Sequence, residues 1–294
     1  MAIEPKITVV GSINMDLVTI TDQIPQIGET LLGNRFQTNP GGKGANQAVA
    51  AARLGANVNM IGCVGNDTFG KELLQHLNDE GVDVSNVEPV TGSTGTATII
   101  VSNQDNSIIV VPAANEHVTA AFVESKRDVI AASDILILQL EIPLEGVLKA
   151  VEIAKENGVK VILNPAPIQE LPTDLIEKID YLTPNEHEFK ELVNGMDEKV
   201  LKEKVILTKG SQGVSFYLDE KEVNIPAFQV NVVDTTGAGD SFNAGFAVAL
   251  SKGLTLNAAC KYGNAVAALS TTKLGAQTGM PTEIEVNDFI KTNE

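Results

Sequence analysis

The amino-acid sequence predicts an α/β fold in which helices cover both faces of a mainly parallel sheet. Short apolar runs alternate with helical patterns along the chain, which is typical of strand–helix–strand units. Small and aliphatic residues also dominate, because hydrophobic residues make up 43% of the chain, aromatic residues make up 4% and Trp is absent. This composition suits helices packed closely against a buried sheet, and 294 residues suffice for one large domain with a small appendage.

The strands and helices of this fold are visible as separate patterns. Apolar runs of strand length lie at residues 7–10, 58–64, 135–140, 159–163 and 205–207. Helical spacing of apolar residues occurs at residues 69–80 and 143–157, and these segments end at Gly81 and Gly158. We therefore expect parallel strands that are connected by helices.

Two segments interrupt this alternation. Residues 17–37 and 94–111 carry β-type residues around turn signals such as Asp105-Asn106 and contain no helical pattern. They predict a small antiparallel sheet, which covers a pocket as a lid, pairs with another subunit or extends the edge of the main sheet. The expected division is a core of residues 1–16, 38–93 and 112–294 and a lid of residues 17–37 and 94–111.

Charge and cysteine content exclude several classes of protein. A formal net charge of -17 and a pI near 4.6 leave no basic stripe for a nucleic-acid backbone, so nucleic acid is not an expected partner. Cys63 and Cys260 lack CxxC spacing, which favours reduced cysteines over a metal site. The sequence carries no signal-peptide pattern and no membrane-spanning apolar stretch, so we expect a cytoplasmic protein without a membrane partner.

A Gly-rich segment near the C-terminus carries the strongest chemical signal. Residues 234–240 read Asp-Thr-Thr-Gly-Ala-Gly-Asp, after a β-type run at 230–233 and before a helical pattern at 241–250. Successive N–H groups at a helix start form an anion site that stabilises a phosphoryl group in transfer. Asp240 would then accept the proton of an attacking hydroxyl group, although an ordinary helix N-cap is the alternative interpretation.

A second Gly-rich segment lies near the N-terminus. Residues 39–46 read Asn-Pro-Gly-Gly-Lys-Gly-Ala-Asn and lead into an Ala-rich helix predicted at 47–54. The spacing of a phosphate loop is absent, because Gly44 and not Ser or Thr follows Lys43. Lys43 and Asn46 suit a neutral, hydroxyl-rich ligand at least equally well.

Polar residues also follow the first predicted strand. Asn14 and Asp16 alternate onto one side of the chain and could bind adjacent hydroxyl groups. An isolated pair of this kind is also frequent in plain turns.

In combination, these motifs resemble the ribokinase-like (PfkB-type) carbohydrate kinases. The segments 41–46 and 234–240, together with Asn14, Asp16 and Asn185-Glu186-His187-Glu188, occur in the order of that family over essentially the whole chain. The resemblance implies a ribokinase-like three-layer α/β/α core with a mainly parallel sheet and a small β-sheet lid. It also implies ATP-dependent phosphorylation of D-ribose at O5, giving ribose 5-phosphate and ADP.

The resemblance further implies roles for individual residues. Asp240 would be the general base, beside an anion hole formed by the backbone of Gly237, Ala238 and Gly239. The implied ribose ligands are Asn14, Asp16, Gly42, Lys43, Asn46, Glu141 and Asp240. The implied nucleotide ligands are Asn185, Glu188, Thr208, Lys209, Gly210, Ser211, Gly213, Gly239 and Asn264, with Glu188 holding Mg²⁺ through water.

The same resemblance implies a monovalent-cation site, typically for K⁺, and a homodimer formed through the lid. The implied cation ligands are Asp234, Thr236, Ser270, Lys273, Gly275 and Gly279. For residues 270–279 the alternative interpretation is a helix end that runs into a loop.

Other functions stay open on the sequence. The chain could be a kinase of deoxyribose, fructose, ketodeoxygluconate or adenosine, or a non-catalytic sugar-binding regulator, because a fold does not fix an activity. A dinucleotide-dependent oxidoreductase is disfavoured, since the first strand leads into Gly11-Ser12-Ile13-Asn14 and not into GxGxxG. The segment between Glu188 and Thr208 is shorter than expected for the family, which affects the predicted surface near the nucleotide rather than the chemistry.

Overall fold

A parallel sheet forms the centre of the molecule. The computed structural model describes residues 4–102, 105–193 and 198–293. These residues include a six-stranded sheet with the order β10-β9-β8-β1-β4-β5, and all of its neighbouring strands are parallel. The strands are β1 (Lys6–Val10), β4 (Asn57–Gly65), β5 (Val82–Val90), β8 (Ile135–Leu138), β9 (Lys160–Leu163) and β10 (Tyr181–Leu182).

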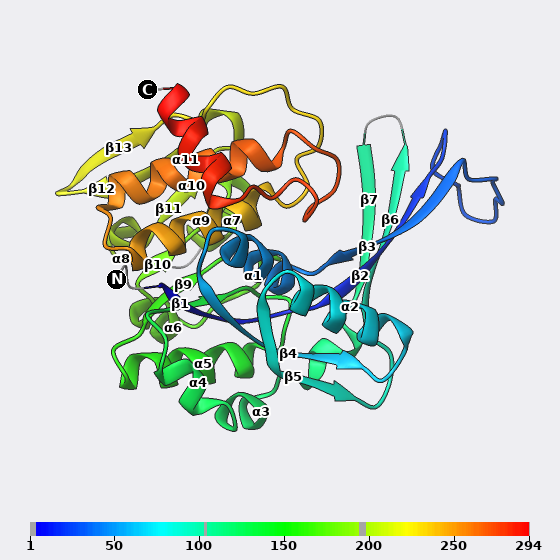
Figure 1. Ribbon diagram of the computed structural model, residues 1–294, viewed down its shortest axis with the longest axis horizontal. Helices are drawn as coiled ribbons and strands as arrows, with labels where there is room; N and C mark the ends of the chain where they lie inside the picture. Colours follow the sequence, from blue (N-terminus) through cyan, green and yellow to red (C-terminus); the bar gives the residue numbers. More distant parts are fainter. Residues whose placement is uncertain (1–3, 103–104, 194–197, 294) are drawn as a thin grey trace.

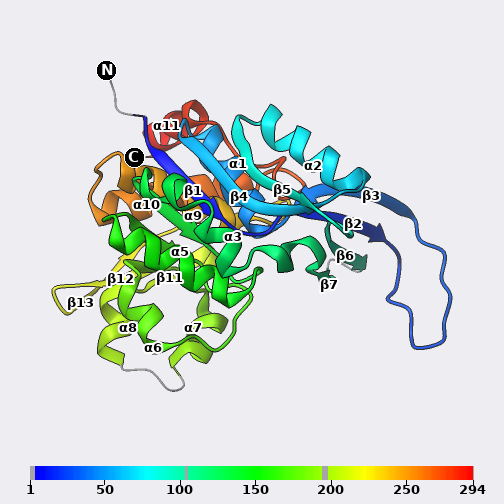
Figure 2. The same cartoon turned by 90° about the horizontal axis from the view of Figure 1, so that it is seen from below.

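Helices cover both faces of this sheet (Figures 1 and 2). One layer consists of α1 (Lys43–Arg53), α2 (Thr68–Asp79), α9 (Ala238–Ser251), α10 (Leu256–Ser270) and α11 (Glu283–Thr292). The other consists of α3 (Ala120–Glu124), α4 (Arg127–Ala131), α5 (Leu144–Glu156), α6 (Thr173–Lys178), α7 (Glu186–Val193) and α8 (Glu198–Lys204). Successive strand residues point to opposite faces, so Val9 lies in one hydrophobic core and Val10 in the other. The predicted three-layer α/β/α architecture is confirmed.

A second sheet projects from the core, and we call it the side sheet (Figure 1). It consists of β2 (Asn14–Ile20), β3 (Arg35–Gly41), β6 (Gly95–Ser102) and β7 (Asp105–Val111) in the order β3-β2-β6-β7. The pairs β2–β3 and β6–β7 are antiparallel as predicted, whereas β2 and β6 pair in parallel. Its strands reach beyond the predicted segments, because β2 begins at Asn14 and β3 ends at Gly41. The side sheet therefore begins within the predicted sugar-binding residues.

The predicted turn at Asp105-Asn106 is the start of β7. Residues 103 and 104 lie outside the described residues. After β7 in the sequence, the 3₁₀ helix η1 (Ala113–His117) returns the chain to the core.

Another antiparallel sheet, separate from the side sheet, follows β10 in the chain. It contains β11 (Ile206–Thr208), β12 (Val214–Leu218) and β13 (Lys221–Ile225), with the 3₁₀ helix η2 (Gly210–Gln212) after β11. The sequence-based strand at 230–233 is wrong. Val233 and Asp234 donate their backbone N–H groups to Thr271 O, and Val232 and Val233 are each 60% exposed. A loop carbonyl and not a neighbouring strand holds this run.

The shortened segment between Glu188 and Thr208 contains the rest of α7 after Glu188, α8 and the start of β11. Residues 194–197 of this segment lie outside the described residues, so its connection is not described. Across the remaining chain, no described helix combines the length and apolar character that a membrane span requires.

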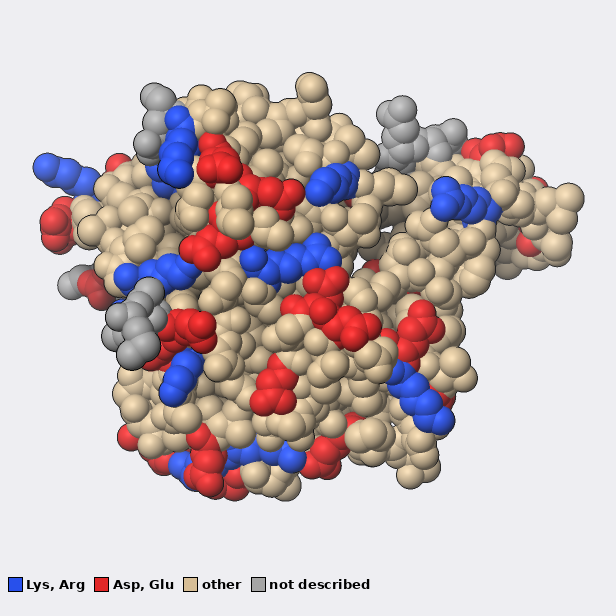
Figure 3. All heavy atoms as spheres, viewed as in Figure 1, with Lys and Arg blue, Asp and Glu red and all other residues tan. Residues whose placement is uncertain are grey.

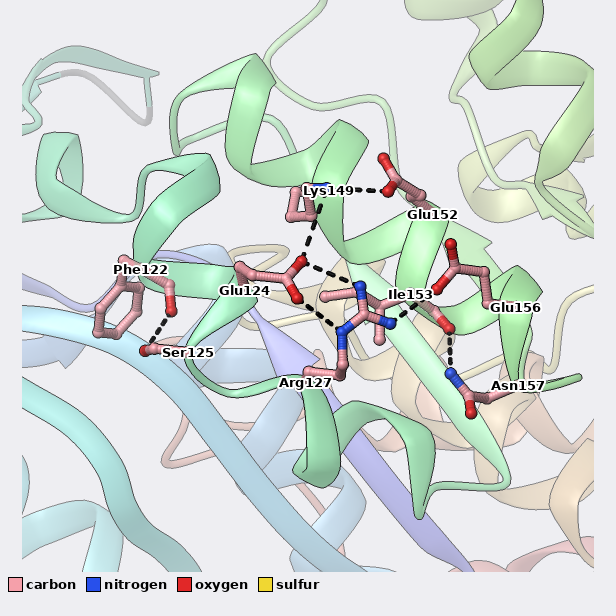
Figure 4. Close-up of polar contacts among 9 residues, drawn as sticks. All are labelled: Phe122, Glu124, Ser125, Arg127, Lys149, Glu152, Ile153, Glu156 and Asn157. Atoms are coloured by element: carbon pink, nitrogen blue, oxygen red, sulfur yellow. Dashed lines mark hydrogen bonds and ion pairs between the residues drawn. The ribbon is translucent and has the colours of Figure 1, made fainter.

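Charged side chains of both signs are interspersed on the face in Figure 3. Figure 4 shows a group of charged side chains in which Arg127 of α4 donates to Glu124 of α3 at 2.6 Å and to Glu156 of α5 at 2.7 Å. Lys149 of α5 lies 3.6 Å from Glu124 and donates to Glu152. These ion pairs join α3, α4 and α5 at the surface, and because exposed ion pairs contribute little to stability we assign them no functional role.

Candidate active site

The topology directs attention to the carboxyl ends of β1 and β8. The chain passes from β1 to β4 and β5 on one side, and later from β8 to β9 and β10 on the other. In open parallel sheets, ligands bind outside the carboxyl ends where the strand order reverses in this way. Polar residues follow the strands at this edge: Ser12, Gln139, Glu141, Asn164 and Thr183.

The first Gly-rich segment delivers two predicted sugar ligands on a helix. Helix α1 begins at Lys43 and not at residue 47, with Gly42 as its N-cap at φ 88°. The earlier start places Lys43 and Asn46 in the first turn. Gly44 packs directly on the chain after β1, because a methyl group there would lie 2.6 Å from Ser12 N. The glycines therefore allow α1 to approach the sheet edge closely.

Glu141 joins the two sides of the switch point. Its Oε2 accepts a hydrogen bond from Ser12 Oγ at 2.5 Å and another from the backbone N–H of Lys43 at 3.1 Å. This carboxylate thus holds the start of α1 against the ends of β1 and β8.

The side chain of Lys43 lies among carboxylates. Burial alone would lower the pKa of Lys43, but Asp240, Glu141, Glu188 and Asp16 outweigh it and raise the pKa above its usual value. The ammonium group is therefore firmly charged. It places a positive charge among these carboxylates.

Asp16 lies on β2, at the base of the side sheet. Burial, followed by repulsion from Glu141 and Asp240, raises the pKa of Asp16 from 3.8 to about 7, against the opposing effect of Lys43. The carboxyl group is thus close to balance between its two forms near neutral pH. In either form it can make a hydrogen bond to a hydroxyl group.

Asp240 is in the first turn of α9 and is 7% exposed. The N-cap of α9 is Gly237, at φ 77°, so the alternative interpretation of Asp240 as the N-cap is wrong. Asn46 Nδ2 donates to Asp240 Oδ2 at 2.9 Å, and Gln47 Nε2 donates to Oδ1 at 2.9 Å. Burial raises the pKa of Asp240, whereas Lys43 and the two amide donors oppose that rise.

The N-terminus of α9 adjoins Asp240. The first N–H groups of a helix have no intrahelical carbonyl partner and carry partial positive charge. Ala238 donates its N–H to Thr235 O at 3.2 Å, whereas a Cβ atom at Gly239 would meet no heavy atom within 4 Å. Gly239 therefore offers open space beside the predicted base, as an anion site requires.

Asn115 is a site residue that the sequence analysis missed. This buried residue of η1 accepts from Ile13 N at 2.9 Å and donates to Asn14 Oδ1 at 2.7 Å. It thereby fixes the side chain of Asn14 at the point where the side sheet leaves the core. No local pattern marks Asn115, because its contacts lie 101 and 102 residues away in the sequence.

The predicted nucleotide residues fall into two groups. Asn185 and Glu188 cap α7 reciprocally: Asn185 Oδ1 accepts from Glu188 N at 2.9 Å, and Glu188 Oε2 accepts from Asn185 N at 2.8 Å. Asn185 also pairs with Thr208 through a β-bridge. Burial raises the pKa of Glu188, against the opposing effects of the Asn185 N–H and of Lys43. The charge of Lys43 therefore acts both on Glu188 and on the predicted sugar ligand Asp16.

The second group lies farther along the chain. It comprises the turn residues Lys209, Gly210, Ser211 and Gly213, and Asn264 of α10. Lys209 Nζ contacts Glu222 Oε1 at 3.2 Å, and Asn264 Nδ2 donates to Ile225 O and Pro226 O at 3.1 Å each. In this structure, these two side chains hold the hairpin and the segment that follows it.

The predicted cation residues bring two loops together. Asp234 accepts hydrogen bonds from Thr236 N, Thr236 Oγ1 and Gly275 N at 2.7–2.9 Å. Burial would raise the pKa of Asp234, but these donors lower it below its usual value. Gly279 packs against Ser270 O, whereas the side chain of Lys273 is 55% exposed. Within the described residues, no three His, Cys, Asp or Glu side chains cluster as a metal site.

Comparisons with known proteins agree with this geometry. The pfkB family carbohydrate kinase profile matches residues 4–283. A ribokinase of Bacillus subtilis is 47% identical over 289 residues, covering 97% of this chain and 99% of that protein. A deoxyribokinase of Salmonella typhi is 37% identical over 305 residues, covering 98% and 99%.

A solved structure is also similar to this chain over nearly its whole length. A structure of Arabidopsis thaliana ribokinase complexed with ribose and ATP superposes with a TM-score of 0.91 at 32% identity, covering 98% of this chain and 99% of that one. The family profile spans nearly the whole chain, including both Gly-rich segments of the candidate site. The chain therefore belongs to the pfkB family of carbohydrate kinases.

Proposed function

We propose that this protein transfers the γ-phosphoryl group of ATP to the 5-hydroxyl group of D-ribose, giving ribose 5-phosphate and ADP. The position of Asp240 carries this proposal, because a buried carboxylate between two amide donors adjoins the N-terminus of a helix. A base for a hydroxyl group and a site for phosphoryl oxygens thus lie side by side. The 47% identical ribokinase supports ribose as the sugar.

The sugar would bind between the carboxyl edge of the sheet and the side sheet. Asp16 and Glu141 would accept hydrogen bonds from its hydroxyl groups, and Lys43 would donate. Asn14, Gly42 and Asn46 complete the proposed set. Several such contacts together would orient the 5-hydroxyl group and lower the entropic cost of the reaction.

Phosphoryl transfer would use Asp240 and the start of α9. The oxygen of the 5-hydroxyl group forms a bond to the γ-phosphorus, the bond from that phosphorus to the ADP oxygen breaks, and the hydroxyl proton moves to Asp240. The transition state is loose, so positioning and charge stabilisation contribute most of the rate. The backbone around Gly237, Ala238 and Gly239 would stabilise the equatorial oxygens.

ATP would contact Asn185, Thr208, Asn264 and the turn that contains η2. We propose Glu188 as the residue that holds Mg²⁺ through water, since only Oε2 is engaged by Asn185 N. Mg²⁺ would neutralise phosphate charge during transfer. For K⁺, Asp234 and the carbonyl groups around Thr236, Ser270, Lys273, Gly275 and Gly279 offer oxygen ligands, which suit a large monovalent ion beside α9.

The side sheet would act as a lid and as a dimer interface. Strand β7 lies at its edge, and the apolar residues Ile108, Ile109, Val110 and Val111 are 43–65% exposed. Because neighbouring residues of a strand face opposite sides, both faces are uncovered in the monomer. One face would close over the sugar, excluding water that competes as the acceptor, and the other would contact a second copy of the chain.

Deoxyribose is the second candidate substrate, because the deoxyribokinase relative is 37% identical over nearly the whole chain. The two sugars differ in the 2-hydroxyl group. A site that binds this hydroxyl group with buried polar side chains discriminates strongly against its absence.

The test is to measure ADP release with Mg²⁺-ATP and K⁺ across ribose, deoxyribose, fructose, ketodeoxygluconate and adenosine. We expect kcat/KM to be highest for ribose. A higher value for another sugar would replace ribose while retaining the kinase mechanism. Absence of turnover with all five would refute the proposal and favour a sugar-binding regulator.

A further inference from the structure

A buried group of amide side chains contacts Asp240 and is hydrogen-bonded internally. Gln47 of α1 is fully buried, and its Nε2 donates to Asp240 Oδ1 at 2.9 Å. The same nitrogen lies 3.3 Å from Asn164 Oδ1, and Gln47 Oε1 accepts from Gln139 Nε2 at 2.7 Å. The sequence marked none of these amides as functional residues.

The chemistry of the carboxylate fixes the orientation of these amides. An ionised carboxylate only accepts hydrogen bonds, so Gln47 must turn its NH₂ group toward Asp240. Its oxygen then faces Gln139, which must present an NH₂ group in turn. Reversing either amide would oppose two oxygen atoms in a buried site, which is costly. The arrangement therefore has a single consistent set of donors.

The other oxygen of Asp240 is fixed in the same way. Asn46 Nδ2 donates to Asp240 Oδ2, and Gln277 Nε2 donates to Asn46 Oδ1 at 2.9 Å. His76 Nε2 lies 2.7 Å from Gln277 Oε1. Adjacent residues of α1 thus bind different oxygens of one carboxylate, which resists rotation of the carboxylate plane.

We propose that Gln47 is a positioning residue for Asp240, and this inference rests on the proposed function of Asp240 as the base. Gln47 would hold Asp240 Oδ1 so that a remaining lone pair faces the 5-hydroxyl group of ribose, which accepts the phosphoryl group. It would also favour the ionised form that accepts the proton. Gln47 is fully buried and its amide is engaged by Asp240, Asn164 and Gln139, so we assign it no contact with the substrate.

The competing explanation is that the amides only satisfy one another in the core. To separate the two, we compare Gln47→Met, which keeps length and removes both polar atoms, with Gln75→Met. Gln75 is an exposed glutamine of α2 that bonds to Asp79 and serves as the matched control. The readouts are kcat, the KM for ribose and the melting temperature.

We expect Gln47→Met to lower kcat about 10- to 100-fold, as loss of geometry at a reacting group does, with the KM for ribose within about twofold. Gln75→Met should leave kcat unchanged. A Gln47→Met protein with normal kcat and a lower melting temperature would overturn the inference, since that result describes a core residue.

The pH profile of kcat gives an independent readout. Gln47→Glu places a second carboxylate against Asp240, among the charged groups Lys43, Glu141 and Asp16. Like charge raises the pKa of Asp240, so the ascending limb of the kcat profile should move to higher pH. An unmoved limb in an active Gln47→Glu protein would contradict the inference.

If both Gln47 variants fail to fold, Gln139→Met tests the same inference at the next residue of the hydrogen-bond chain, because Gln139 contacts Gln47 and not Asp240. It removes the donor that orients Gln47, and we expect a kcat decrease of about two- to tenfold at an unchanged KM. A wild-type kcat would overturn the inference. Failure of the proposed function is recognised separately, because wild-type protein would then not turn over ribose or Asp240→Asn would retain normal turnover.

Discussion

At the scale of residues, Asp240 combines two opposing effects on one carboxylate. Burial disfavours its charge, whereas Lys43, Gln47 and Asn46 favour it. The proposed base would therefore be shielded from water while its donors still favour the ionised form. Its proposed reaction partner, a neutral hydroxyl group, brings no charge that would disturb this balance.

Replacing the carboxylate tests its role as the base. We expect Asp240→Asn to retain ribose binding, because the side chain keeps its shape, and to lose about 10²–10⁴-fold in kcat, the typical contribution of a positioned base. Turnover assays measure kcat, titration calorimetry measures ribose affinity, and circular dichroism checks the fold. Near-normal kcat would remove Asp240 from this role.

Asp16 makes the stability of the sugar-free protein depend on pH. Its pKa is raised from 3.8 to about 7, so the folded protein holds a proton that the unfolded chain releases in that range. The associated stabilisation is complete below pH 3.8 and is lost as the pH rises to about 7. Asp16→Asn cannot ionise and should exceed wild type in unfolding free energy at pH 8 by on the order of 1–4 kcal/mol.

Thermal unfolding at pH 5 and pH 8 without sugar measures this difference, which should shrink at the lower pH. Asp288→Asn is the control, because the Asp288 side chain is 70% exposed. A gap between Asp16→Asn and wild type that is equal at both pH values would argue against the assignment.

At the scale of elements, α1 connects the proposed sugar-binding residues at its first turn with the loop that follows α10. Its first turn supplies Lys43 and Asn46, and at its last turn Arg53 donates to Gln277 O at 2.6 Å and to Met280 O at 3.0 Å. The same helix therefore carries residues proposed to bind the sugar and holds the loop after α10. A small displacement of α1 would disturb both.

Gly44→Ala produces such a displacement. The added methyl group would lie 2.6–2.8 Å from backbone atoms of Gly11 and Ser12, so we expect a loss of about 1–3 kcal/mol in unfolding free energy and a higher KM for ribose. Chemical denaturation and kinetics measure these effects. Gly33→Ala is the control, because its nearest neighbour is the end of the Thr19 side chain at 3.1 Å; equal losses in the two variants would contradict the close-packing argument.

The same scale shows what the sequence could predict. Short apolar runs predicted β1, β4, β8, β9 and β11, and helical spacing predicted α2 and α5, with every end within two residues of the observed one. Strand β10 has only two residues, and the hairpin β12–β13 mixes polar with apolar residues, so neither gave a pattern. The run at 230–233 has strand composition but no partner strand, which only tertiary structure decides.

For the site, local motifs located Lys43, Asn46 and Asp240 because glycines mark close backbone approach in the sequence itself. Asn115, Gln139 and Gln277 gave no such signal. Their role comes from partners 92–231 residues away. Gln139 carries a weak hint, as a polar residue that directly follows a buried apolar strand.

At the scale of the whole molecule, the side sheet carries large apolar residues that the core does not cover. It exposes Phe36 and Ile109 by 64% and 65%. The strand register places both on the face opposite Asp16, because Thr19 pairs with Phe36, and Leu17 aligns through Thr98 with Ile109. An exposed apolar face on an edge strand is unfavourable unless it is covered.

We expect wild-type protein to sediment as a dimer and Ile109→Lys to sediment as a monomer, since a charge in an apolar interface is costly. Analytical ultracentrifugation measures this. Ile284→Lys, at a 74% exposed position of α11, should remain dimeric. A monomeric wild type would refute the proposed interface.

The amide contacts around Asp240 also constrain how the protein acquires activity during synthesis and refolding. Gln47 and Asp240 are 193 residues apart, and Asn46 and Gln277 are 231 apart. Contacts between such distant segments form late, after local structure. A nascent chain that still lacks α9 can build β1, α1 and β4, but the carboxylate proposed as the base has yet to be synthesised. Recovery of turnover should therefore lag behind recovery of helix content, so that enzymatic activity reports completion of the fold.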